Sequence, residues 1–189
     1  GKMGYHAQYR AVADDAPIAL KPDNLSFEEA ASLSFGGSTA LHFLRKANIR
    51  AGEKVLVIGA SGAVGTALVQ LAKHFGAEVT GVTSTTNLKL VASLGADKVI
   101  DYTKEDFVRS GETYDIIVDA VGAAHFARCK DLLRDNGRFL AIGGDMPDLR
   151  ALTGPLMHEL NVEVETLDSL EGFDVARLPK PADEFRPRI

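Results

Sequence analysis

The chain has 189 residues, of which 46% are hydrophobic and 25% charged, and its mean hydropathy is close to zero. This length is enough to bury one full hydrophobic core but hardly two, and the balance is that of a soluble globular domain. The composition excludes disordered, collagen-like and disulfide-rich chains, and no apolar run approaches the ~18 residues of a membrane-spanning helix.

The formal net charge of -5 and the single cysteine further limit which partners and metal sites the protein can have. Proteins that bind nucleic acids usually carry a basic field, so the acidic balance argues against DNA or RNA as a partner. One cysteine, Cys129, permits neither an intramolecular disulfide nor a cysteine-rich metal site. No basic and then apolar leader opens the chain, so we expect a cytoplasmic protein with no secretion signal and no membrane partner.

The two ends of the chain differ from its middle. Residues 4–22 are expected to form a short strand and a loop. A helical pattern begins at Ser26, is interrupted at Gly36 and Gly37, and resumes through Lys46. The tail from residue 169 has weak periodicity and carries three prolines, so we expect it to be irregular.

From residue 55 onward, short β-branched runs alternate with helical patterns. Strands are predicted over 55–58, 78–82, 98–102, 115–119 and 137–142, with 161–165 a candidate sixth. Helices are predicted over 64–75, 87–94 and 125–134, and Thr103 with Asp106 resembles a capping box that opens a short helix through Val108. This alternation predicts an α/β, doubly wound parallel sheet (a Rossmann fold) with helices on both faces and a ligand crevice at the carboxyl ends of the strands.

The turn after the first predicted strand carries the main chemical motif. Gly62 and Gly65 lie three residues apart, after a strand and at the start of a predicted helix. A small residue at position 62 lets backbone N–H groups approach a diphosphate, and one at 65 lets helix and strand pack closely. This context predicts a dinucleotide-binding turn; the alternative is a tight strand-to-helix turn with no ligand.

The end of the second predicted strand indicates which dinucleotide is bound. NAD-binding proteins usually place an acid there for the ribose 2′-hydroxyl, whereas this chain has Ser84, two threonines and Asn87, with Lys89 close behind. Hydroxyls, an amide and an ammonium group accept a 2′-phosphate that a carboxylate would repel, so NADP(H) is favoured over NAD(H). The alternative is a polar loop that is indifferent to the phosphate. The missing acid also argues against a methyltransferase of the same fold.

Taken together, several segments resemble the medium-chain dehydrogenase/reductase superfamily, specifically its zinc-free quinone oxidoreductase-like branch. Their order and spacing match over roughly residues 4 to 145, which is more specific than the glycine turn alone. The matching segments are Leu25–Ala31, Gly37–Ala40, Val55–Gly65, Leu94–Asp97, Val99–Tyr102, Asp119–Gly122 and Gly137–Gly143.

The resemblance implies a role for residues at several turns of the predicted sheet. The pyrophosphate would lie on Ser61, Gly62, Ala63 and Val64, with Gly65 behind them, and the 2′-phosphate on Ser84 and Asn87. Tyr102 would flank the adenosine, Thr39 would reach the nicotinamide carboxamide, and the nicotinamide ribose and ring would be lined by Val121, Gly122, Ile142 and Gly143. Without the resemblance, Tyr102 is equally an ordinary strand-end aromatic, and Thr39 a helix residue that bonds its own backbone.

The chain also departs from that family. Phe35 stands where zinc-using relatives carry a metal-binding cysteine, so we expect no metal. Residues 1–45 resemble the residual end of a GroES-like substrate domain with its connecting helices, 46–168 an NADP-binding Rossmann domain, and 169–189 an irregular tail. The chain therefore resembles a cofactor domain with remnants of its partner domain.

These observations favour an NADPH-dependent oxidoreductase that transfers hydride to a quinone, enone or related carbonyl compound. No catalytic residue is identified. The alternative is an NADP(H)-binding fragment, sensor or degenerate subunit without activity of its own. A short-chain dehydrogenase is excluded because no tyrosine is followed by lysine at Tyr-x-x-x-Lys spacing. By analogy with relatives, residues 161–165 are a candidate contact of a homodimer.

Overall fold

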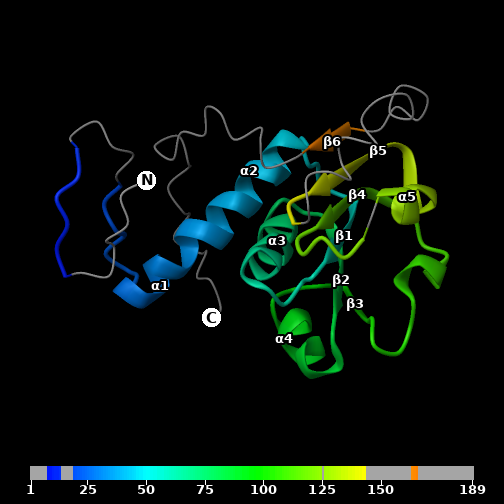
Figure 1. The fold of residues 1–189 in the computed structure, drawn as a ribbon, viewed down its shortest axis with the longest axis horizontal. Coiled ribbons are helices and arrows are strands. Elements are labelled where there is room, and N and C mark those ends of the chain that lie inside the picture. Colours follow the sequence, from blue (N-terminus) through cyan, green and yellow to red (C-terminus); the bar gives the residue numbers. More distant parts are fainter. Residues whose placement is uncertain (1–7, 14–18, 125, 144–162, 166–189) are drawn as a thin grey trace.

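The computed structural model describes residues 8–13, 19–124, 126–143 and the backbone of 163–165. Its centre is a six-stranded sheet in the order β3-β2-β1-β4-β5-β6, in which every neighbouring pair is parallel (Figure 1). The strands are β1 (Lys54–Ile58), β2 (Glu78–Thr83), β3 (Lys98–Asp101), β4 (Tyr114–Asp119), β5 (Leu133–Ala141) and β6 (Glu163–Glu165). This arrangement confirms the predicted doubly wound parallel sheet.

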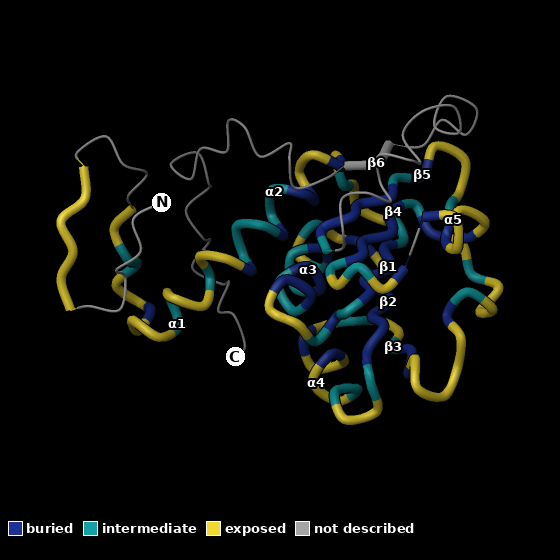
Figure 2. Tube along the Cα trace, viewed as in Figure 1, coloured by how far each residue is buried: buried dark blue, intermediate teal, exposed yellow. Residues whose placement is uncertain are grey.

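Helices cover both faces of the sheet, as predicted. Apolar residues of α2 (Ser38–Lys46), α3 (Ala63–His74) and α4 (Leu88–Ser93) share one buried cluster with one face of the strands. The other face packs against α5 (Phe126–Cys129) and the 3-10 helices Phe107–Ser110 and Lys130–Leu132. Strands covered on both faces must be apolar on both, and Figure 2 shows them as the buried centre.

The helical lead-in to the sheet is continuous, where the sequence predicted a break at two glycines. The first helix, α1 (Phe27–Ser32), begins with a capping box in which Ser26 Oγ accepts from Glu29 N at 3.1 Å. The π-helical turn Leu33–Gly37 then joins α1 directly to α2. Gly36 allows this turn to lie against α3, since a Cβ there would be 2.3 Å from Ala63 O.

Two predicted helices have different bounds. The capping box predicted at Thr103 is absent; Asp106 instead caps the 3-10 helix Phe107–Ser110 by accepting from Val108 N at 3.2 Å. The helix predicted over 125–134 gives way at residue 130 to a 3-10 helix, and Leu133 pairs in the sheet with Tyr114. Pairing of β5 with β4 therefore outweighs the helical pattern at this end.

The remaining predictions concern the ends of the chain. Residues 8–13 and 19–22 contain no strand, so the strand expected within 4–22 is not found in its described part. The tail 169–189 lies outside the described residues, and β6 places the sixth strand at 163–165. Among the described residues, no helix has the length and apolar character that crossing a membrane requires. The division at residues 45 and 168 stays a prediction.

Candidate functional site

The turn between β1 and α3 presents the backbone of a helix N-terminus. Gly59 has φ +80°, a conformation that favours glycine, and its carbonyl accepts from Gly62 N at 3.1 Å. Gly62 is the N-cap of the 12-residue helix α3, and no side-chain hydrogen bond caps that end. The first-turn N–H groups and the helix dipole therefore favour an anion at this position.

The two motif glycines of this turn have separate structural reasons. A Cβ at Gly65 would lie 2.1 Å from Gly59 O and 2.8 Å from Ala60 Cα, so Gly65 is required for close packing of helix on strand. A Cβ at Gly62 would have a single neighbour within 4 Å, Gly59 O at 3.5 Å. The space beside Gly62 is therefore open, as a cradle for a bulky anion requires.

A cleft of about 880 Å³ lies at the carboxyl edge of the sheet. It brings together six of the residues predicted to bind cofactor, namely Ser61, Gly62, Ser84, Asn87, Tyr102 and Val121. Tyr102 is 60% exposed and Val121 54%, which leaves apolar surface available to a ligand. The other predicted residues lie outside its lining: Thr39, Ala63, Val64, Gly65, Gly122, Ile142 and Gly143.

Those other residues lie in three places. The sequence places Ala63, Val64 and Gly65 in the first turn of α3, behind the residues that line the cleft. Thr39 is half-buried on α2, and its predicted contact with a carboxamide stays a prediction. The remaining three belong to the turns that follow β4 and β5.

The turns after β4 and β5 are held together by Asp119, which the sequence analysis did not single out. Asp119 is 2% exposed, and its carboxylate accepts from the backbone N–H groups of residues 121 to 124 at 2.7–3.3 Å. Its backbone carbonyl accepts from Ile142 N and Gly143 N at 2.9 and 3.1 Å. Val121, Gly122, Ile142 and Gly143, which were predicted to line the nicotinamide, therefore lie together. In the sequence, the only indication of this arrangement was an acid at the end of a predicted strand.

The edge of β2 is lined by hydroxyls and an amide. Ser61 Oγ accepts from Thr83 Oγ1 at 2.9 Å and from Asn87 Nδ2 at 3.3 Å. The same amide nitrogen donates to Ser84 Oγ at 3.4 Å. These side chains meet between the first and second strands, where the sequence predicted the adenosine end of a dinucleotide.

Asp101, an acid at the end of the neighbouring strand β3, is already engaged in hydrogen bonds. It is 5% exposed and accepts from the hydroxyls of Thr85 and Thr103, the second at 2.7 Å. Those hydroxyl hydrogen bonds lower the pKa of the Asp101 carboxyl, assisted by the Thr103 backbone N–H and Lys104. Asp101 is thus an ionised acceptor that holds the loops after β2 and β3 together. It follows β3, whereas the acid of NAD-binding proteins follows β2.

The outer wall of the cleft comes from the connection after β3 and from α5. The Arg128 guanidinium lies 2.8 Å from Asp106 Oδ1 and 5.1 Å from the centre of the Phe107 ring. Lys104 and Glu105 line the same wall. Sequence reasoning singled out Asp106 only as part of a capping box and missed this wall, because the fold alone brings Asp106 and Arg128 together.

Metal ligands are sparse in the described part of the chain. Phe35, at the position of the metal-binding cysteine, is 68% exposed on the π-helical turn, and a phenyl ring cannot ligate. Within residues 8–13, 19–124 and 126–143, no three His, Cys, Asp or Glu side chains group as a metal site would require. Cys129 is buried, and burial raises the pKa of its thiol to about 12.

Comparison with known proteins identifies relatives along most of the chain. Residues 63–172 match the family described as zinc-binding dehydrogenase. The chain is 38% identical to the 2-methylene-furan-3-one reductase of Solanum lycopersicum, over 87% of this chain and 44% of the relative. It is 36% identical to the NADPH-dependent alkenal/one oxidoreductase, chloroplastic, of Arabidopsis thaliana, with the same coverage.

Solved structures agree with this result. The quinone oxidoreductase of Coxiella burnetii has a TM-score of 0.73 and 30% identity, over 84% of this chain and 49% of that one. The quinone oxidoreductase of Thermus thermophilus, solved also with NADPH, has a TM-score of 0.65 and 33% identity, over 77% and 48%. The chain thus spans about half the length of its relatives. It belongs to the zinc-binding dehydrogenase family, in the quinone oxidoreductase-like branch of the medium-chain dehydrogenases/reductases.

Proposed function

We propose that this chain is the nucleotide-binding part of an NADPH-dependent oxidoreductase that reduces quinones, enones or related carbonyl compounds. The observation that carries the proposal is one cleft that joins an uncapped helix N-terminus to an edge of hydroxyls and an amide after β2, where residues 83–89 include no acid. It is supported by the relatives, which include an NADPH-dependent alkenal/one oxidoreductase and quinone oxidoreductases.

In this proposal each end of the cleft holds one part of NADP(H). The diphosphate lies on the turn at 61–64, and the adenosine phosphate beside Ser84, Asn87 and Tyr102. The nicotinamide lies against the turns after β4 and β5, which Asp119 holds together. The bound cofactor supplies hydride, while the chain's own residues bind and orient it. No proton donor is assigned to this chain.

A charge substitution tests the preference for the 2′-phosphate. Ser84→Glu places a carboxylate at the edge where we propose that the 2′-phosphate of NADPH binds. Repulsion between the two negative charges therefore weakens NADPH binding. We expect the Kd for NADPH to rise by about tenfold or more and that for NADH by less than about threefold. Equal losses for both nucleotides in fluorescence titrations would contradict the phosphate assignment.

The activity itself is tested with the 189-residue chain and, if the chain is part of a longer protein, with that protein. We expect NADPH oxidation, followed at 340 nm, that depends on an acceptor from a panel of quinones and enones. If no acceptor in the panel supports oxidation, the reductase proposal is wrong.

The alternative of a chain that only binds NADP(H) gains no support from these relatives, which are named as reductases and oxidoreductases. Thermal stabilisation of the 189-residue chain by NADPH tests binding separately from turnover. We further propose a cytoplasmic location and a homodimer contact along β6, the last strand of the sheet. Cell fractionation and light scattering, respectively, test these two proposals.

A further inference from the structure

The amide of Asn87 connects two walls of the cleft. Its Nδ2 donates to Ser61 Oγ at 3.3 Å and to Ser84 Oγ at 3.4 Å. Ser61 lies in the turn that opens α3, whereas Ser84 follows β2, and all three residues line the cleft. One side chain therefore contacts the hydroxyls of both segments.

The hydrogen-bond partners of Ser61 determine where its own proton points. A hydroxyl has one proton to donate and two lone pairs that accept. Ser61 Oγ accepts from Asn87 Nδ2 and also from Thr83 Oγ1 at 2.9 Å. Thr83 is 1% exposed, so this second donor is fixed at the edge of the sheet. With both lone pairs taken, the Ser61 proton is left for an acceptor in the cleft.

The amide of Asn87 also donates a hydrogen bond to the hydroxyl of Ser84. Ser84 Oγ accepts from Asn87 and lies 3.2 Å from Thr86 Oγ1. The hydrogen bond that Ser84 Oγ accepts from Asn87 uses a lone pair and leaves the hydroxyl proton, which either Thr86 Oγ1 or a ligand phosphate can accept. Both N–H bonds of the Asn87 amide are thereby committed to serines, and neither remains for a ligand phosphate.

We propose that Asn87 is a positioning residue that acts through Ser61 and Ser84, orienting both hydroxyls as donors to the two phosphate-bearing parts of the dinucleotide. This inference rests on the proposed function, because it requires NADP(H) in the cleft. It also changes the expected role of Asn87, which the family resemblance places in direct contact with the 2′-phosphate. A direct contact affects NADPH alone, whereas control of Ser61 affects NADH as well.

A double-mutant cycle on the 189-residue chain separates the two roles. Kd values for NADH and NADPH are measured for wild type, Asn87→Ala, Ser61→Ala and the double variant. For NADH we expect Asn87→Ala to raise Kd about 3- to 5-fold and Ser61→Ala about 5- to 10-fold, the scale of one hydrogen bond. The double variant is expected to equal Ser61→Ala, because Asn87 acts on NADH only through Ser61.

Two further measurements keep the result interpretable. Thermal unfolding midpoints establish that each variant is folded, and Asn87→Gln, which retains the amide donor, is expected to recover part of the NADH affinity. If wild type binds both nucleotides and Asn87→Ala lowers the affinity for NADPH alone, the positioning role is wrong. It is also wrong if the losses of NADH affinity in Asn87→Ala and Ser61→Ala add up in the double variant. If wild type binds neither nucleotide, the proposed function and this inference are both rejected.

Discussion

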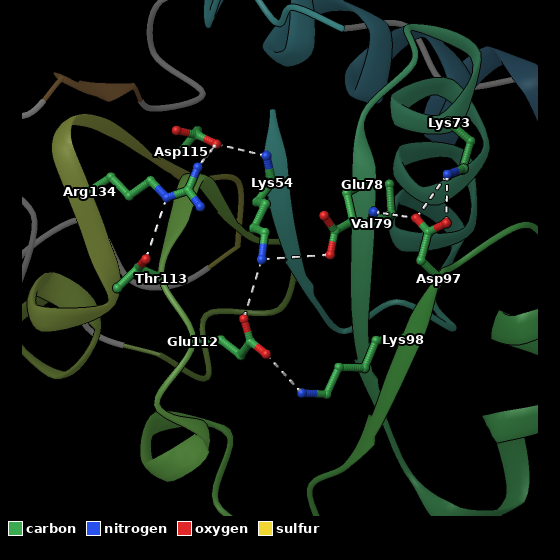
Figure 3. Close-up of polar contacts among 10 residues, drawn as sticks. All are labelled: Lys54, Lys73, Glu78, Val79, Asp97, Lys98, Glu112, Thr113, Asp115 and Arg134. Carbon is green, nitrogen blue, oxygen red and sulfur yellow. Dashed lines mark hydrogen bonds and ion pairs between the residues drawn. The ribbon is translucent and has the colours of Figure 1, made fainter. Parts of the chain in front are cut away.

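The two edges of the sheet use polar residues in opposite ways. At the amino edge, charged side chains pair with one another across the strands (Figure 3). Lys54 lies 3.7 Å from Glu78 and 3.4 Å from Glu112, and Lys98 lies 3.6 Å from Glu112. At the carboxyl edge, glycines, hydroxyls and one amide line the side of a cleft of about 880 Å³ that follows β1 and β2, and charged residues are confined to its outer wall.

This difference separates groups that stabilise the fold from groups that are available to a ligand. Charged side chains at the amino edge form ion pairs with one another. Near the C-terminal turn of α3, for example, Lys73 Nζ lies 2.8 Å from Asp97 Oδ2. A lysine there is also favoured by the helix dipole. At the opposite end of α3, the N–H groups have no side-chain cap. Variants at the two edges should therefore affect different measurements.

The largest expected effect is on stability, at the glycine that lets helix and strand approach. Gly65→Ala places a Cβ 2.1 Å from Gly59 O, a backbone atom that cannot rotate away. We expect the free energy of unfolding to fall by about 3 kcal/mol or more, measured by urea denaturation. Gly62→Ala is the matched control, because a Cβ there meets no atom closer than 3.5 Å, and it should leave stability nearly unchanged. A stable Gly65→Ala protein would contradict the packing role.

The next effect is on binding, at the other motif glycine. Gly62→Val puts a branched side chain into the open space beside the helix N-terminus, where a Cβ would have Gly59 O at 3.5 Å as its nearest neighbour. We expect NADPH affinity to fall by at least about 100-fold, since the branched side chain occupies the volume of the diphosphate. Isothermal titration calorimetry checks affinity, and an unchanged unfolding midpoint checks the fold. Retained affinity in a folded Gly62→Val protein would overturn the assignment of this turn.

The sequence was sufficient to predict the sheet and the centre of the cleft, for a physical reason. Parallel strands buried on both faces produce short β-branched runs, and a glycine turn between strand and helix has a local spacing. The strands β1 to β5 and the turn at 59–65 could therefore be predicted. Ser61, Ser84 and Asn87 were predicted separately, but their mutual hydrogen bonds were not.

What the sequence could not predict depends on contacts between segments that lie far apart along the chain. Asp101 reaches Thr85 across 16 positions, and Arg128 reaches Asp106 across 22, so no local pattern connects them. The C-terminal end of the helix predicted over 125–134 was wrong for the same reason, since Leu133 pairs with Tyr114 in the sheet. The local pattern of apolar residues carries no information on whether a segment gains more from a helix or from pairing with a distant strand.

The smallest expected effect is at the amino edge and depends on pH. Asp97 is partly desolvated, which alone would raise its pKa, but hydrogen bonds from Lys73 and from Val79 N hold the pKa of its carboxyl below the usual 3.8. A carboxyl whose pKa is lowered on folding stabilises the protein above its unfolded pKa, and this contribution is lost as pH falls through the folded value. Glu112 behaves alike, because Lys54 and Lys98 lower its pKa from 4.5.

We therefore expect Asp97→Asn to lower the free energy of unfolding by only about 1 kcal/mol at pH 7, since the Asp97 side chain is 42% exposed and its charge is screened by solvent. The stability difference between wild type and variant should shrink as pH falls below about 3.8, because wild-type Asp97 is then increasingly protonated. Urea denaturation across pH 7 to 3 measures it. The Kd for NADPH at pH 7 should stay within about twofold of wild type, because Asp97 lies at the edge away from the cleft. A larger change in Kd would show that the two edges are coupled and that the amino edge does more than stabilise the fold.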